Sequence, residues 1–240
     1  MEISGSRALV TGGNRGLGAR LVTELLKRDA AKVYLASRSV DAVAREVRDD
    51  PRVEVVALDV ADPASVAAAA ERARDVTVLI NNAGVLGFGT VLDGDLGLFE
   101  RDLHTNYLGA LRVARAFLPA LRNAPGDAAI VNVLTLIALA PVAPMAGYCA
   151  SKAAAHSMTQ ALRAAVAPDG IRVIGAYPGG IDTEMLAGVE GDKADPGTVA
   201  ARIVAGLAEG DQVIWPDDAS ARAGQVYLGD PVGLERMLAS

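Results

Sequence analysis

The chain has 240 residues and a mass of 24.6 kDa, with 51% hydrophobic and 22% charged residues. This composition is typical of one globular domain and excludes a disordered chain. The formal net charge of -6 and the pI of about 5.0, without a segment rich in Lys or Arg, argue against nucleic acid or an anionic membrane as a partner. One cysteine, Cys149, and two distant histidines, His104 and His156, predict neither a disulfide nor a metal site.

The start of the chain and its longest uncharged stretch favour a cytoplasmic protein. Residues 1–6 lack the basic beginning of a secretory signal. The stretch Ala128–Ser151 is long enough to raise the question of a membrane span, but Asn132, Pro141 and Pro144 interrupt it. A buried strand followed by an apolar loop explains this stretch better, so no membrane partner is expected.

Apolar, strand-like runs alternate with helical segments along the chain. The runs are rich in Val, Ile and Leu, as in strands buried on both faces: Ala8–Val10, Val33–Ala36, Val53–Leu58, Val76–Ile80, Ala129–Leu134, Arg172–Ala176 and Gln212–Trp215. The predicted helices are Gly16–Arg28, Val40–Asp49, Pro63–Arg74, Asn106–Arg122, Tyr148–Val166 and Thr198–Leu207. This alternation predicts an α/β fold, a doubly wound parallel sheet of about seven strands with helices on both faces. One irregular segment lies near 185–197, and no boundary divides residues 1–240.

A glycine-rich loop follows the first predicted strand. Its sequence, TGGNRGLG at positions 11–18, leads directly into a predicted helix. Backbone N–H groups and the helix dipole at such a turn attract a phosphate. The alternative is a plain glycine turn. The loop lies where open parallel sheets bind ligands, beyond the carboxyl ends of the strands, which favours a phosphate site.

Together with three later motifs, this loop resembles the short-chain dehydrogenase/reductase family. Asp59-Val60 follows the third strand, Asn81-Asn82-Ala83-Gly84 the fourth, and Pro178-Gly179 with Thr183 the sixth. The resemblance covers nearly the whole length, with the motifs in the family's order. It implies a single Rossmann-like, NADP-binding oxidoreductase domain over residues 1–240, with a substrate loop near 185–197. The cofactor contacts it implies are Gly12, Asn14, Arg15, Gly16, Leu17, Gly18, Ser37, Arg38, Asp59, Val60, Asn82, Ala83, Gly84, Tyr148, Lys152, Pro178, Gly179, Ile181 and Thr183.

The end of the second strand bears on the choice between NAD and NADP. An acidic residue there would bind the ribose hydroxyls of NAD, whereas an arginine accommodates a 2′-phosphate. Here the strand ends in Ser37-Arg38, and the first acid, Asp41, belongs to the next predicted helix. Arg15 can approach the same phosphate, and guanidinium groups offer bidentate contacts to it. NADP(H) is therefore the expected cofactor; the alternative is that both arginines are ordinary surface residues.

Tyr148 and Lys152 stand four residues apart in a predicted helix and so share one face. A nearby ammonium and a nicotinium ring favour the phenolate, and the lowered pKa lets the phenol donate to a carbonyl oxygen as hydride arrives. The alternative is a buried aromatic ring beside a lysine that extends to water. The family resemblance implies Tyr148 as catalytic acid/base, Lys152 as a partner of the ribose and of the tyrosine, and Asn106 in a water relay.

Position 135 departs from the family pattern, which has a serine thirteen residues before the catalytic tyrosine. Thr135 stands at this position, and no serine lies between it and Tyr148. Threonine keeps a hydroxyl that can donate to a substrate carbonyl and adds a methyl group that takes space. We expect Thr135 to take the serine's catalytic role. The alternative is a strand-terminal residue in a weakened or inactive site.

The residues that flank the predicted catalytic groups are apolar. The candidate substrate contacts are Leu136, Ala143, Met145, Gly180, Met185 and Leu186. They include no cation that would hold a carboxylate or phosphate. A small neutral carbonyl or alcohol is therefore the expected substrate, and the sequence leaves its identity open.

Two functions remain open at this stage. The expected one is NADPH-dependent reduction of a ketone or aldehyde by hydride transfer, with alcohol oxidation as the reverse. The alternative is a non-catalytic NADP-binding sensor or scaffold protein, because a fold alone does not establish an activity. The helices Asn106–Arg122 and Tyr148–Val166 are apolar on more than one stripe. Because the family pairs these helices across a two-fold axis, we expect a homodimer or homotetramer.

Overall fold

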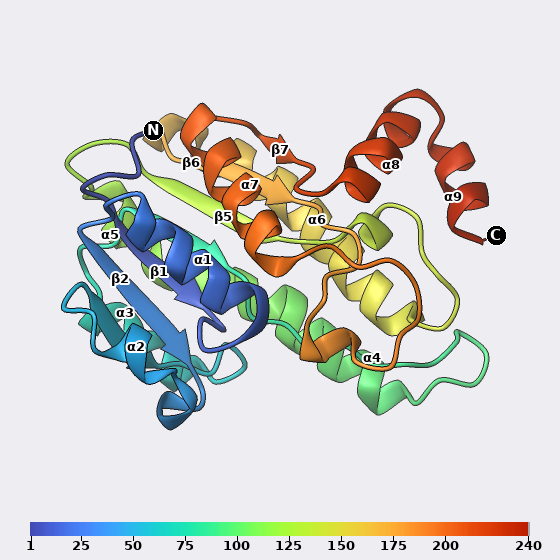
Figure 1. Ribbon diagram of the computed structural model, residues 1–240, viewed down its shortest axis with the longest axis horizontal. Helices are drawn as coiled ribbons and strands as arrows, with labels where there is room; N and C mark the ends of the chain where they lie inside the picture. Colours follow the sequence, from blue (N-terminus) through green and yellow to red (C-terminus); the bar gives the residue numbers. More distant parts are fainter. Residues whose placement is uncertain (240) are drawn as a thin grey trace.

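A parallel sheet of seven strands forms the centre of the computed structural model, which describes residues 1–239 (Figure 1). The strands are β1 (Arg7–Thr11), β2 (Lys32–Ser37), β3 (Val53–Ala57), β4 (Val78–Asn81), β5 (Ala129–Val133), β6 (Arg172–Ala176) and β7 (Val213–Ile214). Their order is β3-β2-β1-β4-β5-β6-β7, so the winding reverses between β1 and β4. The predicted α/β fold is confirmed. A switch point of this kind is where such sheets bind ligands.

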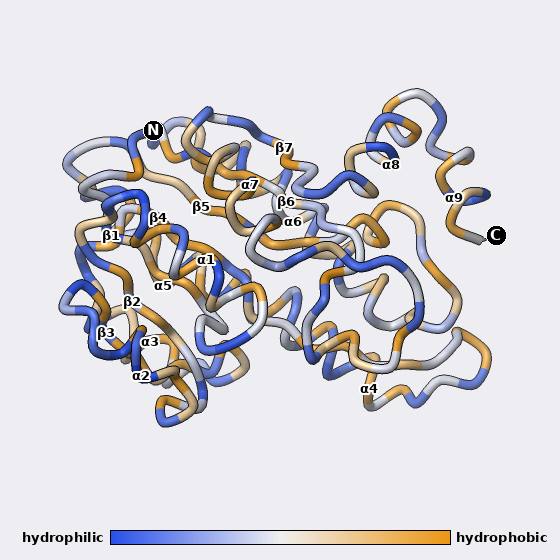
Figure 2. The backbone as a smooth tube through the Cα atoms, viewed as in Figure 1, coloured by the Kyte–Doolittle hydropathy of each residue, from blue (hydrophilic) through white to orange (hydrophobic). Residues whose placement is uncertain are grey.

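Helices cover both faces of the sheet because successive strand side chains point to opposite sides. In β1, Ala8 and Val10 pack on one face, whereas Leu9 packs on the other. In Figure 2, strand β5 runs through the interior of the molecule and is mostly in the orange shades of hydrophobic residues. The first face carries α1 (Gly16–Lys27) and α7 (Pro196–Glu209), and the second carries α3 (Pro63–Arg72), α5 (Ala110–Arg122) and the end of α6 (Ala146–Val166).

The helix predicted to start at Asn106 begins earlier in the structure. Helix α4 (Leu96–Asp102) continues through a π-helical segment, η2 (Leu103–Gly109), into α5. The carboxylate of Asp95 caps α4 by accepting the Gly97 N–H at 2.8 Å. Asn106 therefore lies inside the π-helical segment, a local widening that is frequent at functional sites.

The predicted helix Val40–Asp49 is wrong as a continuous element. The chain forms a short 3₁₀ turn, η1 (Val40–Ala42), and a four-residue helix, α2 (Arg45–Arg48), with extended backbone between them. Val43 is the buried hydrophobic residue of this segment, and neither η1 nor α2 has a buried residue. A single longer helix would thus gain little packing on the sheet, and amphipathic packing supplies most helix stability in proteins.

Two C-terminal helices, α8 (Asp218–Gly229) and α9 (Pro231–Ala239), were not predicted. Asp217 and Ser220 form a capping box at the start of α8, which is the local signal for this helix. The pair extends beyond the edge of the sheet (Figure 1) and packs on the 3₁₀ turn η3 (Leu136–Ala138) through Ala223 and Leu234. Among the described helices, none is long and apolar enough to cross a membrane.

Candidate active site

A cavity of about 1240 Å³ lies beyond the carboxyl ends of the strands. It is lined by the glycine loop, by residues that follow β3 and β4, and by Tyr148 and Lys152 of α6. Three of the predicted site residues do not line it: Ser37 is buried, Ala143 points to solvent, and Asn106 lies buried behind the wall. The remaining predicted catalytic, cofactor and substrate residues share this cavity, from Gly12 and Asn14 to Ile181 and Thr183.

The glycine loop leaves the first turn of α1 open to the cavity. Arg15 is the N-cap residue, and no described side chain caps this helix. Gly12 and Gly16 have φ values of 66° and 54°, in the left-handed region that favours glycine. Asn82 fixes the loop by donating to Thr11 O at 2.9 Å. The free N–H groups and the positive end of the helix dipole fit the pyrophosphate of a dinucleotide.

Gly18 packs so closely on this loop that it offers a direct test. A β-carbon at Gly18 would lie 2.1 Å from Gly12 O and 2.6 Å from Asn82 Nδ2. We expect Gly18→Ala to displace the loop, weaken cofactor binding at least tenfold, and destabilise the fold by about 1–3 kcal/mol, as overpacking does. Cofactor titration and thermal unfolding measure the two effects. Gly126→Ala, at a position with open space around the missing β-carbon, is the matched control.

Two arginines, Arg38 and Arg15, belong to the cavity lining. Arg15 is paired with Glu184 at 2.6 Å, and both side chains are mostly exposed. Ser37 does not reach the cavity because its Oγ is turned back to accept the Ser39 N–H at 3.1 Å. The predicted contact of Ser37 with a cofactor stays a prediction. Arg38 and Arg15 both line the cavity, and Arg15 shares its guanidinium with the carboxylate of Glu184.

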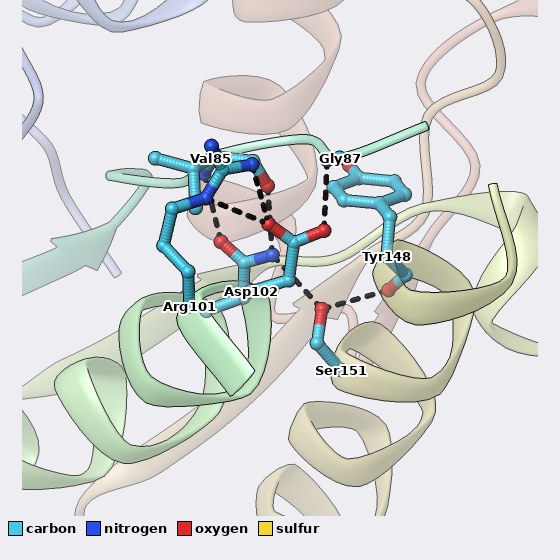
Figure 3. Close-up of polar contacts among 7 residues, drawn as sticks. Val85, Gly87, Arg101, Asp102, Tyr148 and Ser151 are labelled. Carbon is cyan, nitrogen blue, oxygen red and sulfur yellow. Dashed lines mark hydrogen bonds and ion pairs between the residues drawn. The ribbon is translucent and has the colours of Figure 1, made fainter. Parts of the chain in front are cut away.

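Asn106 links helix α6 to the chain segment that follows β4. Its Nδ2 donates to Val85 O and to Ser151 Oγ, each at 2.9 Å, and its Oδ1 accepts the Val85 N–H at 2.9 Å. Ser151 Oγ in turn donates to Tyr148 O at 2.7 Å (Figure 3). Both N–H groups of the amide are thus used. The side chain ties α6 to the segment after β4, and its predicted role in a water relay stays an expectation.

Tyr148 and Lys152 are both buried, with 8% and 6% of their surface exposed. Lys152 Nζ donates to Val133 O at 2.8 Å and lies 5.8 Å from the centroid of the Tyr148 ring. Burial lowers the pKa of Lys152 to about 8. Burial, with smaller effects of Cys149 and Asp102, raises the pKa of Tyr148. In the protein without cofactor, desolvation of the phenol outweighs the effect of Lys152, and the expected lowering by the ammonium together with a nicotinium ring stays a prediction.

Thr135 lies at the end of β5, on the wall that also carries Tyr148. Its hydroxyl donates to Pro178 O at 3.2 Å, and the same carbonyl accepts the Leu136 N–H at 2.9 Å. Because Pro178 O keeps the bond from Leu136, the hydroxyl of Thr135 can turn to another acceptor in the cavity at low cost.

Sequence reasoning missed several residues of the cavity wall. Arg101 lines the cavity and adds a cation to those that the sequence analysis had named. Its guanidinium is held by the buried Asp102, with Nη2 2.9 Å from Oδ1. Leu238 reaches the cavity from α9, at the far end of the chain. No short-range motif marks any of these three positions. The other lining residues that were not predicted are Leu58, Ala61, Val85, Leu86, Gly97, Glu100, His104, Thr105, Val133, Leu134, Ile137, Val142, Glu184, Val189 and Ala219.

Comparison with known proteins decides the family. A family model described as short chain dehydrogenase matches residues 6–194. This chain belongs to the short-chain dehydrogenase family. The family resemblance that the sequence motifs indicated is confirmed. As a short-chain dehydrogenase the protein is an oxidoreductase with a nicotinamide cofactor, and the open helix terminus and glycine loop described above fit that cofactor.

Individual relatives support the same assignment for this short-chain dehydrogenase. A solved short chain dehydrogenase from Burkholderia cenocepacia J2315, in complex with NADP, is 38% identical, covers 100% of both chains and has a TM-score of 0.93. A 3-alpha-(or 20-beta)-hydroxysteroid dehydrogenase of Mycobacterium bovis is 35% identical over 197 residues, 80% of this chain and 75% of that protein. The 17-beta-hydroxysteroid dehydrogenase type 2 of Homo sapiens is 32% identical over 196 residues, 77% of this chain and 50% of that protein.

Proposed function

We propose that this short-chain dehydrogenase is an NADPH-dependent carbonyl reductase that also oxidises the corresponding alcohol. The observation that supports this most is the shared wall of Thr135, Tyr148 and Lys152, which continues into the glycine loop in one cavity. A hydroxyl donor, a phenol and an ammonium at one place are the groups that carbonyl reduction requires.

Three residues of this chain have separate roles in the reduction. NADPH, when bound, supplies the hydride. Thr135 donates a hydrogen bond to the substrate oxygen and so stabilises the negative charge that develops on it. Tyr148 transfers its proton to that oxygen. Lys152, at the same wall, holds the ribose and offers the positive charge that favours phenolate afterwards. The buried surroundings of Tyr148 keep water away from the proton it transfers.

The preference for NADPH rests on Arg38, with Arg15 as its partner in the cavity lining. Because no acid ends β2, we expect the parent protein to have the higher kcat/KM with NADPH. Arg38→Asp removes a bidentate phosphate contact and adds a negative charge. It should lower kcat/KM for NADPH roughly 10- to 100-fold and leave NADH less affected. Steady-state kinetics with both cofactors measure this, and equal values in the parent would contradict it.

The substrate that we propose is a neutral carbonyl compound with an apolar body. Among the predicted contacts, Leu136, Met145, Gly180, Met185 and Leu186 line the cavity, whereas Ala143 does not. The two hydroxysteroid dehydrogenases among the relatives make bulky cyclic ketones useful probes beside small ones. We also propose that the protein is a homodimer or homotetramer built on α5 and α6.

The non-catalytic alternative is tested with the same reagents. The loss of NADPH absorbance is followed with a panel of aliphatic, aromatic and steroid ketones and aldehydes. Turnover of any member supports the reductase. Tight NADPH binding without turnover of any member would support the sensor or scaffold function instead.

A further inference from the structure

Asp102 is a buried carboxylate behind the cavity wall that carries Tyr148, and the mechanism above does not use it. Its side chain has no exposed surface. Oδ2 accepts the Gly87 N–H at 2.8 Å, and Oδ1 accepts Nη2 and Nε of Arg101 at 2.9 and 3.3 Å (Figure 3). A buried carboxylate is costly unless it is paired and hydrogen-bonded, so this arrangement calls for a role that an apolar residue could not fill.

The bond to Gly87 connects Asp102 to the start of α6. Two residues after Gly87, Gly89 donates to Pro144 O at 2.9 Å and accepts the Ala146 N–H at 3.1 Å. Leu86 packs against the cluster that contains Tyr148. The segment that Asp102 holds is therefore the one that covers the catalytic tyrosine.

Asp102 and Asn106 act on this segment as a pair. They are four residues apart, at the end of α4 and in η2, and they bind Gly87 and Val85 respectively. Asn106 offers neutral hydrogen bonds, whereas Asp102 adds a charge. Only Asp102 therefore has an electrostatic effect on Tyr148 that extends beyond the groups it contacts.

Titratable groups surround Tyr148 on three elements. Lys152 and Cys149 lie on α6, Glu100, Arg101 and Asp102 on α4, and Glu184 on the 3₁₀ turn η5 (Glu184–Leu186). Of the three acids, Asp102 is the buried one. The wall segments 135–138 and 178–181 contain no titratable side chain. The ring of His104 in η2 lies 3.4 Å from Ala61 O, through its Nε2. The Arg101 side chain is 44% exposed, so water screens its charge more than that of Asp102.

We propose that Asp102 is a positioning residue that holds the Gly87 segment over Tyr148 and whose charge favours the protonated, proton-donating tyrosine. The enzyme is thereby set for carbonyl reduction at neutral pH, and alcohol oxidation needs more alkaline conditions. This inference rests on the proposed function, because it assumes Tyr148 as acid/base. An amide at this position has one acceptor oxygen, so it could keep the bond from the Gly87 N–H but not the bonds from Arg101 as well.

Asp102→Asn in the full chain with NADP⁺ bound removes the charge and keeps one acceptor oxygen for the Gly87 N–H. The ionisation of Tyr148 is read from the ultraviolet absorbance of tyrosinate, as the difference between each protein and its Tyr148→Phe counterpart across pH. We expect the midpoint to fall by about 0.5–1 pH unit, because the nearby negative charge is lost. The pH profile of alcohol oxidation should shift in the same direction. An unchanged or higher midpoint would overturn the proposal.

The double variant Arg101→Gln/Asp102→Asn keeps the test open if the single variant does not fold. It removes both charges and leaves no unpaired guanidinium, so we expect a smaller fall of the midpoint than in Asp102→Asn. Asp93→Asn removes an exposed carboxylate outside the cavity and should leave the midpoint unchanged.

A fall of turnover at every pH with a constant midpoint would show a purely structural role. Parental turnover in Tyr148→Phe would instead refute the proposed function, and the tyrosinate titration would still report the effect of Asp102.

Discussion

Replacing Tyr148 by phenylalanine should reduce turnover by at least ~10²–10⁴, the usual range for a lost general acid. The ring of Tyr148 packs with Met145 and Cys149, and phenylalanine keeps those contacts. The backbone bond from Ser151 Oγ to Tyr148 O is also independent of the side chain. The fold and the cofactor site should therefore survive while the proton donor is lost. Single-turnover reduction of the best ketone of the panel, with NADPH binding measured separately, distinguishes the two effects.

Tyr177→Phe is the matched control for this experiment. Tyr177 is also buried, and burial raises the pKa of its phenol to about 12. Its hydroxyl lies 2.7 Å from His156 Nδ1, and the residue does not line the cavity. Its loss should cost about 1 kcal/mol of stability, as for one hydrogen bond, and leave turnover near the parental value. If Tyr148→Phe behaved like Tyr177→Phe, Tyr148 would not be the acid.

The features that could be predicted from the sequence are those that depend on residues close together in the chain. Strand β5 is apolar except for Asn132, and the TGGNRGLG loop follows β1 directly, so the sequence alone was enough to predict both. The spacing of Tyr148 and Lys152 within one helix is equally local. Because parallel strands end at the same edge of the sheet, these local signals also placed the cavity.

What could not be predicted depends on long-range packing. Arg101 and Asp102 are adjacent charged residues in an otherwise ordinary helix, and only the fold shows that one is fully buried against Gly87. Leu238 reaches the cavity because α9 folds back onto η3, a contact between distant parts of the chain. Ser37 lies outside the cavity lining for a local reason, since its hydroxyl accepts the Ser39 N–H. The direction of the Tyr148 pKa likewise follows from burial, which composition does not reveal.

Thr135→Val should lower kcat by roughly 10²–10³, the loss found when one donor to a developing oxyanion is removed. Valine keeps the branched shape, so the packing at the end of β5 changes little. Pro178 O keeps the N–H of Leu136 at 2.9 Å, so no buried acceptor is left without a partner. The expected defect is therefore chemical and not structural, and NADPH binding should match that of the parent. A valine variant with parental kcat would show that Thr135 is only a strand-terminal residue.

Thr135→Ser should behave in the opposite way, because it keeps the hydroxyl and frees the space of one methyl group. Activity is expected to persist with all ketones of the panel and to rise with the bulkier ones, since Thr135 and Leu136 share the wall with Tyr148. The comparison also separates the two functions weighed for this protein. A parent without turnover and a serine variant that gains it would identify a cofactor-binding protein whose chemistry was lost at this one position. An active parent, an active serine variant and an inactive valine variant would establish Thr135 as the donor that stabilises the substrate oxygen.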